Sequence, residues 1–218
     1  MSESFTDTPL LSARFDSALH YATRHHARQL RKGTPIPYAA HILAAASLVL
    51  EMHGDEDEAI GALLHDVVED GGGRRALAEI EAAFGPAVAA LVAATSDTLD
   101  PDEDRRGGAG WYARKRAYVD AIAHKQPDEL RVSLADKLHN ARAILLDYRT
   151  HGDGLWDRFK AGEGDSIRWY YRSLFDAFAA RRDALGERAV PALEELGRTI
   201  AEIDRLAGAA RPASPQRP

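Results

Sequence analysis

The chain of 218 residues contains no cysteine. It therefore forms no disulfide, and any metal ion must be bound through nitrogen and oxygen atoms. That donor set suits Mn, Mg, Fe, Co or Zn in a site without sulfur. A chain without cysteine is also compatible with a reducing cytoplasm, where we expect the protein to act.

Long apolar runs and excess positive charge are absent as well. The longest apolar stretches, such as residues 42–50, are much shorter than the roughly 20 residues that span a bilayer. Residues 1–11 lack the basic and apolar regions of a secretory signal. The net charge of −6 argues against general binding to nucleic acid, which needs a basic face. We therefore expect neither a membrane nor a nucleic acid as a partner.

One local basic cluster interrupts this acidic background. Its members are Arg24, His25, His26, Arg28, Arg31 and Lys32. Two interpretations remain open for it. The cluster is either the solvated face of a helix or a local site for a compact anion such as a phosphorylated small molecule.

Alanine, leucine and charged residues recur with helical periodicity almost throughout, and strict apolar–polar alternation is absent. We therefore expect one all-α domain over residues 12–207, between an N-terminal tail (1–11) and a disordered C-terminal tail (208–218). The sequence leaves open whether the polar, glycine-rich loop at 97–110 closes over a site. The expected helices span residues 12–30, 38–53, 55–70, 74–84, 86–94, 111–124, 128–148, 165–185 and 190–207.

The segment ALLHDVVED (62–70) places one imidazole and three carboxylates on one edge of an expected helix. His65 adjoins Asp66, and Glu69 and Asp70 follow one helical turn later. Three carboxylates beside an imidazole repel one another unless a cation lies among them or a proton is shared. This segment is therefore a candidate metal site and a candidate acid–base site.

Two distant residues extend this candidate set. His41 and Asp136 each stand among small apolar residues, where a lone polar side chain needs a partner. With His65 and Asp66 they supply two imidazoles and two carboxylates, a reasonable set for a catalytic divalent ion. Spacing alone does not show that the four meet. His139 receives the default interpretation of a hydrogen-bonded helix residue.

Several segments in order resemble the HD-domain phosphohydrolases, and more narrowly the hydrolase domain of RelA/SpoT-type proteins and the stand-alone small alarmone hydrolases. The resemblance covers roughly residues 12–148. HD alone is a weak signal, whereas HDVVED followed at this separation by LADKLHNAR is a strong one. The matching segments are YATRHHARQLRKG (21–33), PYAAH (37–41), ALLHDVVED (62–70), FGPAVAALV (84–92) and LADKLHNAR (134–142).

The resemblance implies a single HD-domain helical bundle that is an enzyme. It implies one Mn²⁺ bound by His41, His65, Asp66 and Asp136, while the sequence itself leaves open another divalent ion such as Zn, Fe, Co, Ni or Mg. It further implies that water removes the 3′-pyrophosphate of a guanosine alarmone, (p)ppGpp, and leaves GDP or GTP. Glu69 and Asp70 match the family's catalytic pair.

The resemblance also implies nucleotide contacts by Arg31, Lys32 and Asn140. A plain surface lysine is the alternative for Lys32, and Arg142 is expected to form an internal ion pair.

Departures from the family pattern include Ile42 after the first metal histidine, Gly33 after Arg-Lys, and Ala143. They surround the nucleobase side and put guanine specificity in doubt, and two alternatives stay open beside (p)ppGpp hydrolysis. One is hydrolysis of another nucleotide, such as an adenosine alarmone or the 2′-phosphate of NADPH. The other is a module that binds alarmones without cleaving them.

The aromatic residues after the matching region are expected to lie mainly in the core, with base stacking as the alternative for one of them. They are Trp156, Phe159, Trp169, Tyr170 and Tyr171. The sequence does not indicate an oligomeric state.

Overall fold

The computed structural model describes residues 6, 8–96, 99, 110–159 and 164–210, and within these ranges the fold is all-α. The exception to helix and loop there is an isolated antiparallel bridge between Leu30 and Pro37. None of the described helices is long and apolar enough to cross a membrane.

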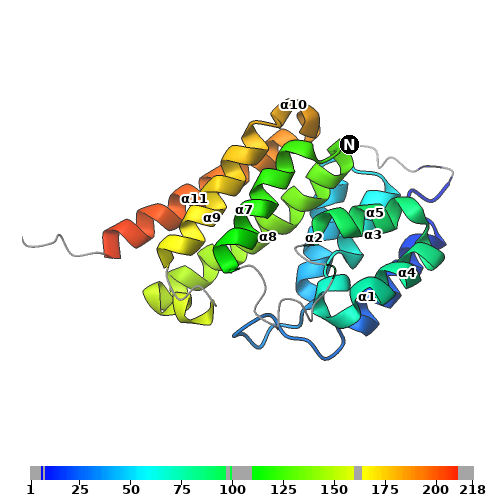
Figure 1. The fold of residues 1–218 in the computed structure, drawn as a ribbon, viewed down its shortest axis with the longest axis horizontal. Coiled ribbons are helices and arrows are strands. Elements are labelled where there is room, and N and C mark those ends of the chain that lie inside the picture. Colours follow the sequence, from blue (N-terminus) through cyan, green and yellow to red (C-terminus); the bar gives the residue numbers. More distant parts are fainter. Residues whose placement is uncertain (1–5, 7, 97–98, 100–109, 160–163, 211–218) are drawn as a thin grey trace, which may run out of the picture.

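The first half of the chain forms one group of helices, on the right of Figure 1. It includes α1 (Ala13–His25), α2 (Ala39–Glu51), α3 (Glu56–Leu64), the π-helical turn η1 (Val68–Gly72), α4 (Gly73–Phe84) and α5 (Pro86–Thr95).

The second half packs beside the first, and its last helices extend away on the left of Figure 1. It includes α7 (Trp111–Ala121), η2 (Ile122–His124), α8 (Pro127–His151), η3 (Gly152–Arg158), α9 (Gly164–Ala179), α10 (Arg182–Leu185), η4 (Glu187–Ala189) and α11 (Val190–Ala210).

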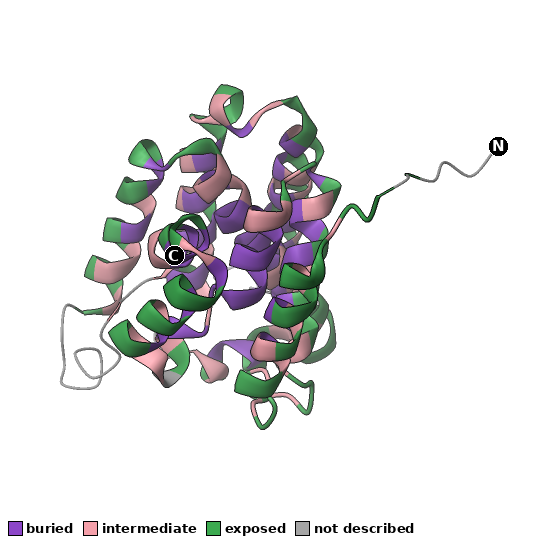
Figure 2. Ribbon diagram, turned by 90° about the vertical axis from the view of Figure 1, so that its right-hand side faces the viewer, coloured by how far each residue is buried: buried purple, intermediate pink, exposed green. Residues whose placement is uncertain are grey.

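Helix α8 connects the two groups. It contacts α2, α3 and α5 on one side and α9 and α11 on the other. Leu130, Leu134, Leu138 and Ala141 recur at helical spacing along α8 and are fully buried. Burying each leucine side chain contributes roughly 1.5–3 kcal/mol. Figure 2 shows the resulting buried interior, with exposed residues on the outer helix surfaces.

Helix boundaries follow local signals in the sequence. Asp55 caps α3 in a capping box with Glu58, since each side chain bonds the other's backbone N–H. Pro86 and Pro127 occupy the first positions of α5 and α8, where the missing N–H is not needed.

Several expected boundaries were wrong. The first helix ends at His25 instead of continuing to residue 30, because the chain turns into the loop closed by the Leu30–Pro37 bridge. The predicted helix 165–185 is interrupted after Ala179 before α10 begins.

The predicted helix 55–70 was also wrong, because α3 ends at Leu64. A turn and the π-helical η1 follow. The glycines after Asp70 permit this change, because Gly73 has a φ of 54°, a conformation that favours glycine.

Helix α11 continues to Ala210, so the first three residues of the predicted disordered tail are helical. The rest of that tail, and most of the predicted loop 97–110, lie outside the described residues.

Candidate metal centre

The His65–Asp66 pair lies in the turn directly after α3. Leu63, Leu64 and Val67 around it are fully buried, so the turn is fixed in the core. His65 is itself 1% exposed. The sequence thus places the His65 imidazole where water cannot satisfy it, beside a carboxylate that is partly buried.

Two other helices bring His41 and Asp136 to the same point. Nε2 of His41 on α2 lies 3.2 Å from Nε2 of His65 and 3.3 Å from Oδ2 of Asp66. Nε2 of His65 lies 3.0 Å from the same Oδ2. Oδ1 of Asp136 on α8 lies 3.2 Å from Nε2 of His41 and 3.7 Å from Nε2 of His65. The structure therefore gathers all four predicted ligands, with His41, His65 and Asp66 closest as a group.

The outward nitrogens of the two imidazoles show what this cluster fits. His65 Nδ1 lies 2.7 Å from the carbonyl oxygen of Ala62, which only accepts, so this nitrogen carries the proton. His41 Nδ1 lies 2.8 Å from Nδ1 of His139. When His41 also carries its proton on Nδ1 and donates it to His139, the two Nε2 lone pairs and the two carboxylates converge as acceptors. Such a set requires a cation or added protons, and two imidazoles with two carboxylates suit a divalent ion.

The electrostatics of the cluster agree with that requirement. Burial alone would lower the pKa of His65, but Asp66 and Asp136 outweigh it and raise this pKa well above its usual value. Burial would raise the pKa values of the two carboxyls. The neighbouring imidazoles nevertheless hold the pKa of Asp66 well below its usual range, and Lys137 together with the imidazoles does the same for Asp136. The site therefore favours ionised carboxylates beside positive charge.

Neighbouring side chains hold both carboxylates in place. Tyr38 donates its hydroxyl proton to Asp66 Oδ2 at 2.5 Å. Asn140 donates to Asp136 Oδ1 at 2.5 Å, and Lys137 Nζ lies 2.7 Å from Asp136 Oδ2. Burial and Asp66 raise the pKa of Tyr38, so its hydroxyl stays a donor.

The predicted catalytic pair lies just beyond the cluster. Glu69 and Asp70 belong to η1, and π-turns recur at functional sites. Gln29 donates to Asp70 Oδ2 at 2.6 Å. Burial, opposed by this hydrogen bond, raises the pKa of the Asp70 carboxyl.

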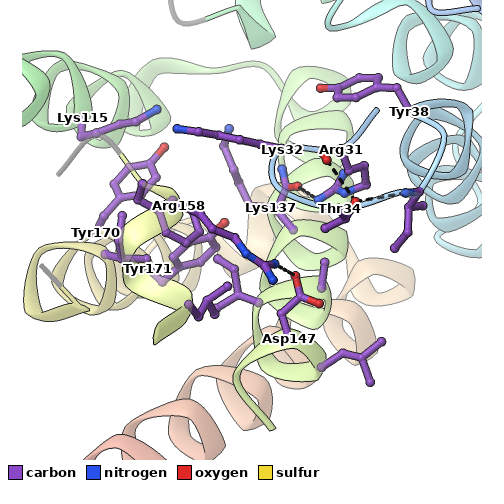
Figure 3. Close-up of a pocket in the computed structure, with 18 of the residues that line it drawn as sticks. Arg31, Lys32, Thr34, Tyr38, Lys115, Lys137, Asp147, Arg158, Tyr170 and Tyr171 are labelled. Atoms are coloured by element: carbon purple, nitrogen blue, oxygen red, sulfur yellow. Dashed lines mark hydrogen bonds and ion pairs between the residues drawn. The ribbon is translucent and has the colours of Figure 1, made fainter. Parts of the chain in front are cut away.

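Tyr38, Lys137 and Asn140, which contact the carboxylates of the cluster, also line a cavity of about 420 Å³. Figure 3 shows this cavity. Its lining includes five cationic side chains and one acidic side chain, on a protein whose net charge is negative. In Figure 3, the side chains of Lys32 and Lys115 extend toward each other. The charged lining residues are Arg31, Lys32, Lys115, Lys137, Arg158 and Asp147.

All three predicted substrate contacts lie at this cavity. Arg31 donates to the side-chain Oδ1 of Asn140 at 2.8 Å, so the Asn140 side chain bridges Arg31 and Asp136. Arg31, Lys32 and Asn140 all line the cavity.

The basic cluster predicted from the sequence is divided in the structure. Arg24, His25 and Arg28 are exposed on the outside, and His26 is buried. Arg142 lies 3.8 Å from Glu195 in a half-exposed ion pair.

The C-terminal aromatic residues serve both the core and the cavity. Trp156, Tyr170 and Tyr171 are buried. The two tyrosines and Phe159 also line the cavity, and Phe159 and Trp169 pack against the core from its edge.

The sequence pattern of the HD-domain family matches residues 18–157, well over half of the chain. The chain belongs to the HD-domain family. All four predicted ligands fall inside the matched region.

Two proteins of similar sequence and one solved structure indicate which members of the HD-domain family this protein resembles. It is 32% identical over 143 residues to guanosine-3′,5′-bis(diphosphate) 3′-pyrophosphohydrolase MESH1 of Drosophila melanogaster, over 64% of this chain and 74% of that protein. It is 34% identical over 131 residues to a GTP pyrophosphokinase of Streptomyces coelicolor, over 60% of this chain but only 15% of that protein.

The solved structure is that of a metazoan orthologue of SpoT that hydrolyses ppGpp. It superimposes with a TM-score of 0.67 at 26% identity, over 88% of this chain and 97% of that one. The HD-domain protein is therefore a hydrolase, and the alternative of a non-catalytic module is not supported.

Sequence reasoning missed three residues that contact the site, namely Tyr38, Gln29 and His139. The first two stand inside segments that carried the resemblance, but their partners are distant in sequence. His139 follows Asp136 by three residues, so it lies on the same helix face, and that spacing was the available signal.

Proposed function

We propose that this HD-domain hydrolase removes the 3′-pyrophosphate of (p)ppGpp in the cytoplasm with Mn²⁺ as its metal. The observation that carries the proposal is the cluster of His41, His65, Asp66 and Asp136 beside a cavity rich in cationic side chains. Relatives that share this domain are named for that reaction.

The cavity suits a nucleotide with several phosphates. Arg31 bonds to Asn140, and Lys137 pairs with the predicted ligand Asp136. Both cations line the cavity beside the cluster, so they would bind the phosphates that react. Tyr170 and Tyr171 add aromatic surface on another wall. Cationic side chains bind phosphate through charge-assisted hydrogen bonds, and aromatic rings bind bases by stacking.

Two imidazoles and two carboxylates would hold the metal ion. When bound, that ion would supply a nucleophilic water at neutral pH and withdraw charge from the phosphoryl oxygen. The oxygen of water forms a bond to the 3′-linked phosphorus, and the bond from that phosphorus to the ribose oxygen breaks. Glu69 and Asp70 would orient the water, and one of them would accept its proton. The ribose oxygen gains a proton, and pyrophosphate and GDP leave.

The direct experiment incubates the purified protein with ppGpp and Mn²⁺ and analyses products by anion-exchange chromatography. We expect GDP and pyrophosphate in equal amounts. Intact ppGpp, with metal verified in the protein, would refute the proposal.

A second candidate keeps the reaction and changes the nucleotide, such as an adenosine alarmone or NADPH. It is favoured by the cavity wall around Gly33 and Ala143, which departs from the family pattern. Arg158 lies so close to Gly33 that a Cβ atom added at position 33 would lie 2.8 Å from Cδ of Arg158. Parallel assays of these nucleotides decide between the candidates, and an exclusive preference for ppGpp would eliminate the second.

A further inference from the structure

Gln29 connects a buried histidine to the predicted catalytic carboxylate. Its side-chain amide donates to Asp70 Oδ2 at 2.6 Å, and its Oε1 lies 2.7 Å from Nδ1 of His26. Gln29 is 41 residues from Asp70 in sequence, so the contact is tertiary.

The chemistry of the partners fixes the direction of this chain of hydrogen bonds. A carboxylate only accepts, so the amide nitrogen of Gln29 must face Asp70 and its oxygen must face His26. His26 Nδ1 therefore carries a proton that it donates to Gln29. Among the described residues, the imidazole of His26 makes no other hydrogen bond, because Nε2 is buried without a partner, and Nδ1 also lies 3.9 Å from Asp70 Oδ2. A 2%-exposed imidazole with this single hydrogen bond acts as a rigid support for the amide.

The loop between α1 and α2 fixes this support relative to the metal cluster. The backbone N–H of Tyr38 donates to the backbone carbonyl oxygen of Gln29 at 2.9 Å. The backbone N–H of Arg31 donates to the backbone carbonyl oxygen of Ile36 at 2.8 Å. The His26 and Tyr38 rings pack with centroids 4.8 Å apart. Gln29 and Tyr38 thus form the base of one loop, and their side chains hold Asp70 and Asp66 respectively.

We propose that Gln29, supported by His26, is a positioning residue that presents the Oδ1 atom of Asp70 to the attacking water. The inference rests on the proposed function, in which an acid of the Glu69–Asp70 pair accepts the proton of water. Gln29 occupies Oδ2, and Oδ1 has no hydrogen-bond partner among the described residues. Oδ1 is therefore the oxygen left to accept the proton.

The kinetic test replaces Gln29 with Met, which keeps the length of the side chain and removes both polar groups. This substitution removes the hydrogen bond from Gln29 to the charged carboxylate of Asp70. Because hydrogen bonds to charged groups are stronger than those between neutral groups, we expect kcat for ppGpp to fall about tenfold or more. KM and bound metal should stay within about twofold of the wild type, because Gln29 is not among the cavity lining and its side chain bonds to His26 and Asp70, neither of which is a predicted metal ligand. The exposed neighbour Leu30 gives the control, since L30A should leave kcat unchanged.

A second readout does not depend on any substrate. In Zn²⁺-loaded protein, carbon-13 NMR measures the pKa of the Asp70 carboxyl, which the D70N variant assigns. Burial and Asp66 raise this pKa, and Gln29, His26 and His25 lower it. Removing the Gln29 donor must therefore raise it further in Q29M.

An unchanged Asp70 pKa, or a Q29M kcat equal to that of the wild type, would overturn the inference. An equal loss of metal and activity in Q29M would also overturn it, because that pattern indicates a structural role. If the wild type cleaves no nucleotide, the proposed function fails, and with it the catalytic role of Gln29. The NMR measurement then still reports whether Gln29 bonds to Asp70.

Discussion

Nδ1 of His41 lies 2.8 Å from Nδ1 of His139, and this contact joins a predicted metal ligand on α2 to helix α8. Burial, His41 and Arg31 lower the pKa of His139 to about 4. His139 is therefore neutral at pH 7, and its Nδ1 can accept the His41 proton. With the proton on Nδ1, the lone pair of His41 Nε2 is free to face the cluster.

Removing this acceptor should weaken metal binding. Loss of a hydrogen bond that orients a metal ligand typically reduces affinity about 10- to 100-fold. We expect H139F to show such a loss when metal-free protein is titrated with Mn²⁺. H151F alters an exposed histidine at the end of α8 and should bind as the wild type does. Equal affinity of H139F and the wild type would contradict the role of His139.

Asp136 is predicted to be a ligand itself, so its removal should have a larger effect than that of His139. We expect D136A to lose bound metal on purification, as measured by elemental analysis. D147N changes an acid 11 residues further along α8 and should retain the metal. A D136A protein with wild-type metal content would show that Asp136 is not a ligand.

The Arg158–Asp147 pair lies at the end of the cavity remote from the cluster. Arg158 Nη1 lies 2.9 Å from Asp147 Oδ2 (Figure 3). Asp147 is about 16 Å along α8 from Asp136 at 1.5 Å per residue. We expect R158M to raise KM for ppGpp about three- to tenfold with little change in kcat. The reason is that Arg158, remote from the reacting phosphorus, would bind substrate and transition state equally well. Steady-state kinetics measure this, and a fall in kcat alone would place Arg158 at the reacting phosphate instead.

The Glu58–Arg131 ion pair stabilises the packing of α3 on α8. Arg131 donates to Glu58 at 2.6 Å, and Glu58 is 3% exposed. Replacing Arg131 with Met leaves a buried charge without its partner, which should cost about 3 kcal/mol of unfolding free energy. Urea denaturation measures the cost. The exposed Arg75–Glu79 pair is the control, and R75M should have an unchanged midpoint, because surface pairs contribute little.

Much of the fold was accessible from the sequence because its determinants are local. Helical periodicity, the Asp55 cap and Pro86 mark helices and their starts. The errors arose where tertiary contacts override that pattern. The loop after His25 is closed by backbone hydrogen bonds to residues near Tyr38, and no pattern within the first helix indicates them.

The candidate site divides in the same way. His65 and Asp66 are adjacent in sequence, so their proximity was certain. Their meeting with His41 and Asp136 depends on how α2, α3 and α8 pack, and spacing could not indicate it without the family resemblance. The catalytic and ligand roles of these residues remain predictions that the experiments above address.

Hydrolysis of ppGpp in ¹⁸O-labelled water by the Mn²⁺-loaded protein tests the central claim most directly. Phosphorus-31 NMR and mass spectrometry of the products report which bond breaks and where the label goes. Attack of water on the 3′-linked phosphorus predicts one labelled oxygen in pyrophosphate and none in GDP. Unreacted ppGpp, release of single phosphates, or label in the ribose hydroxyl would contradict the account.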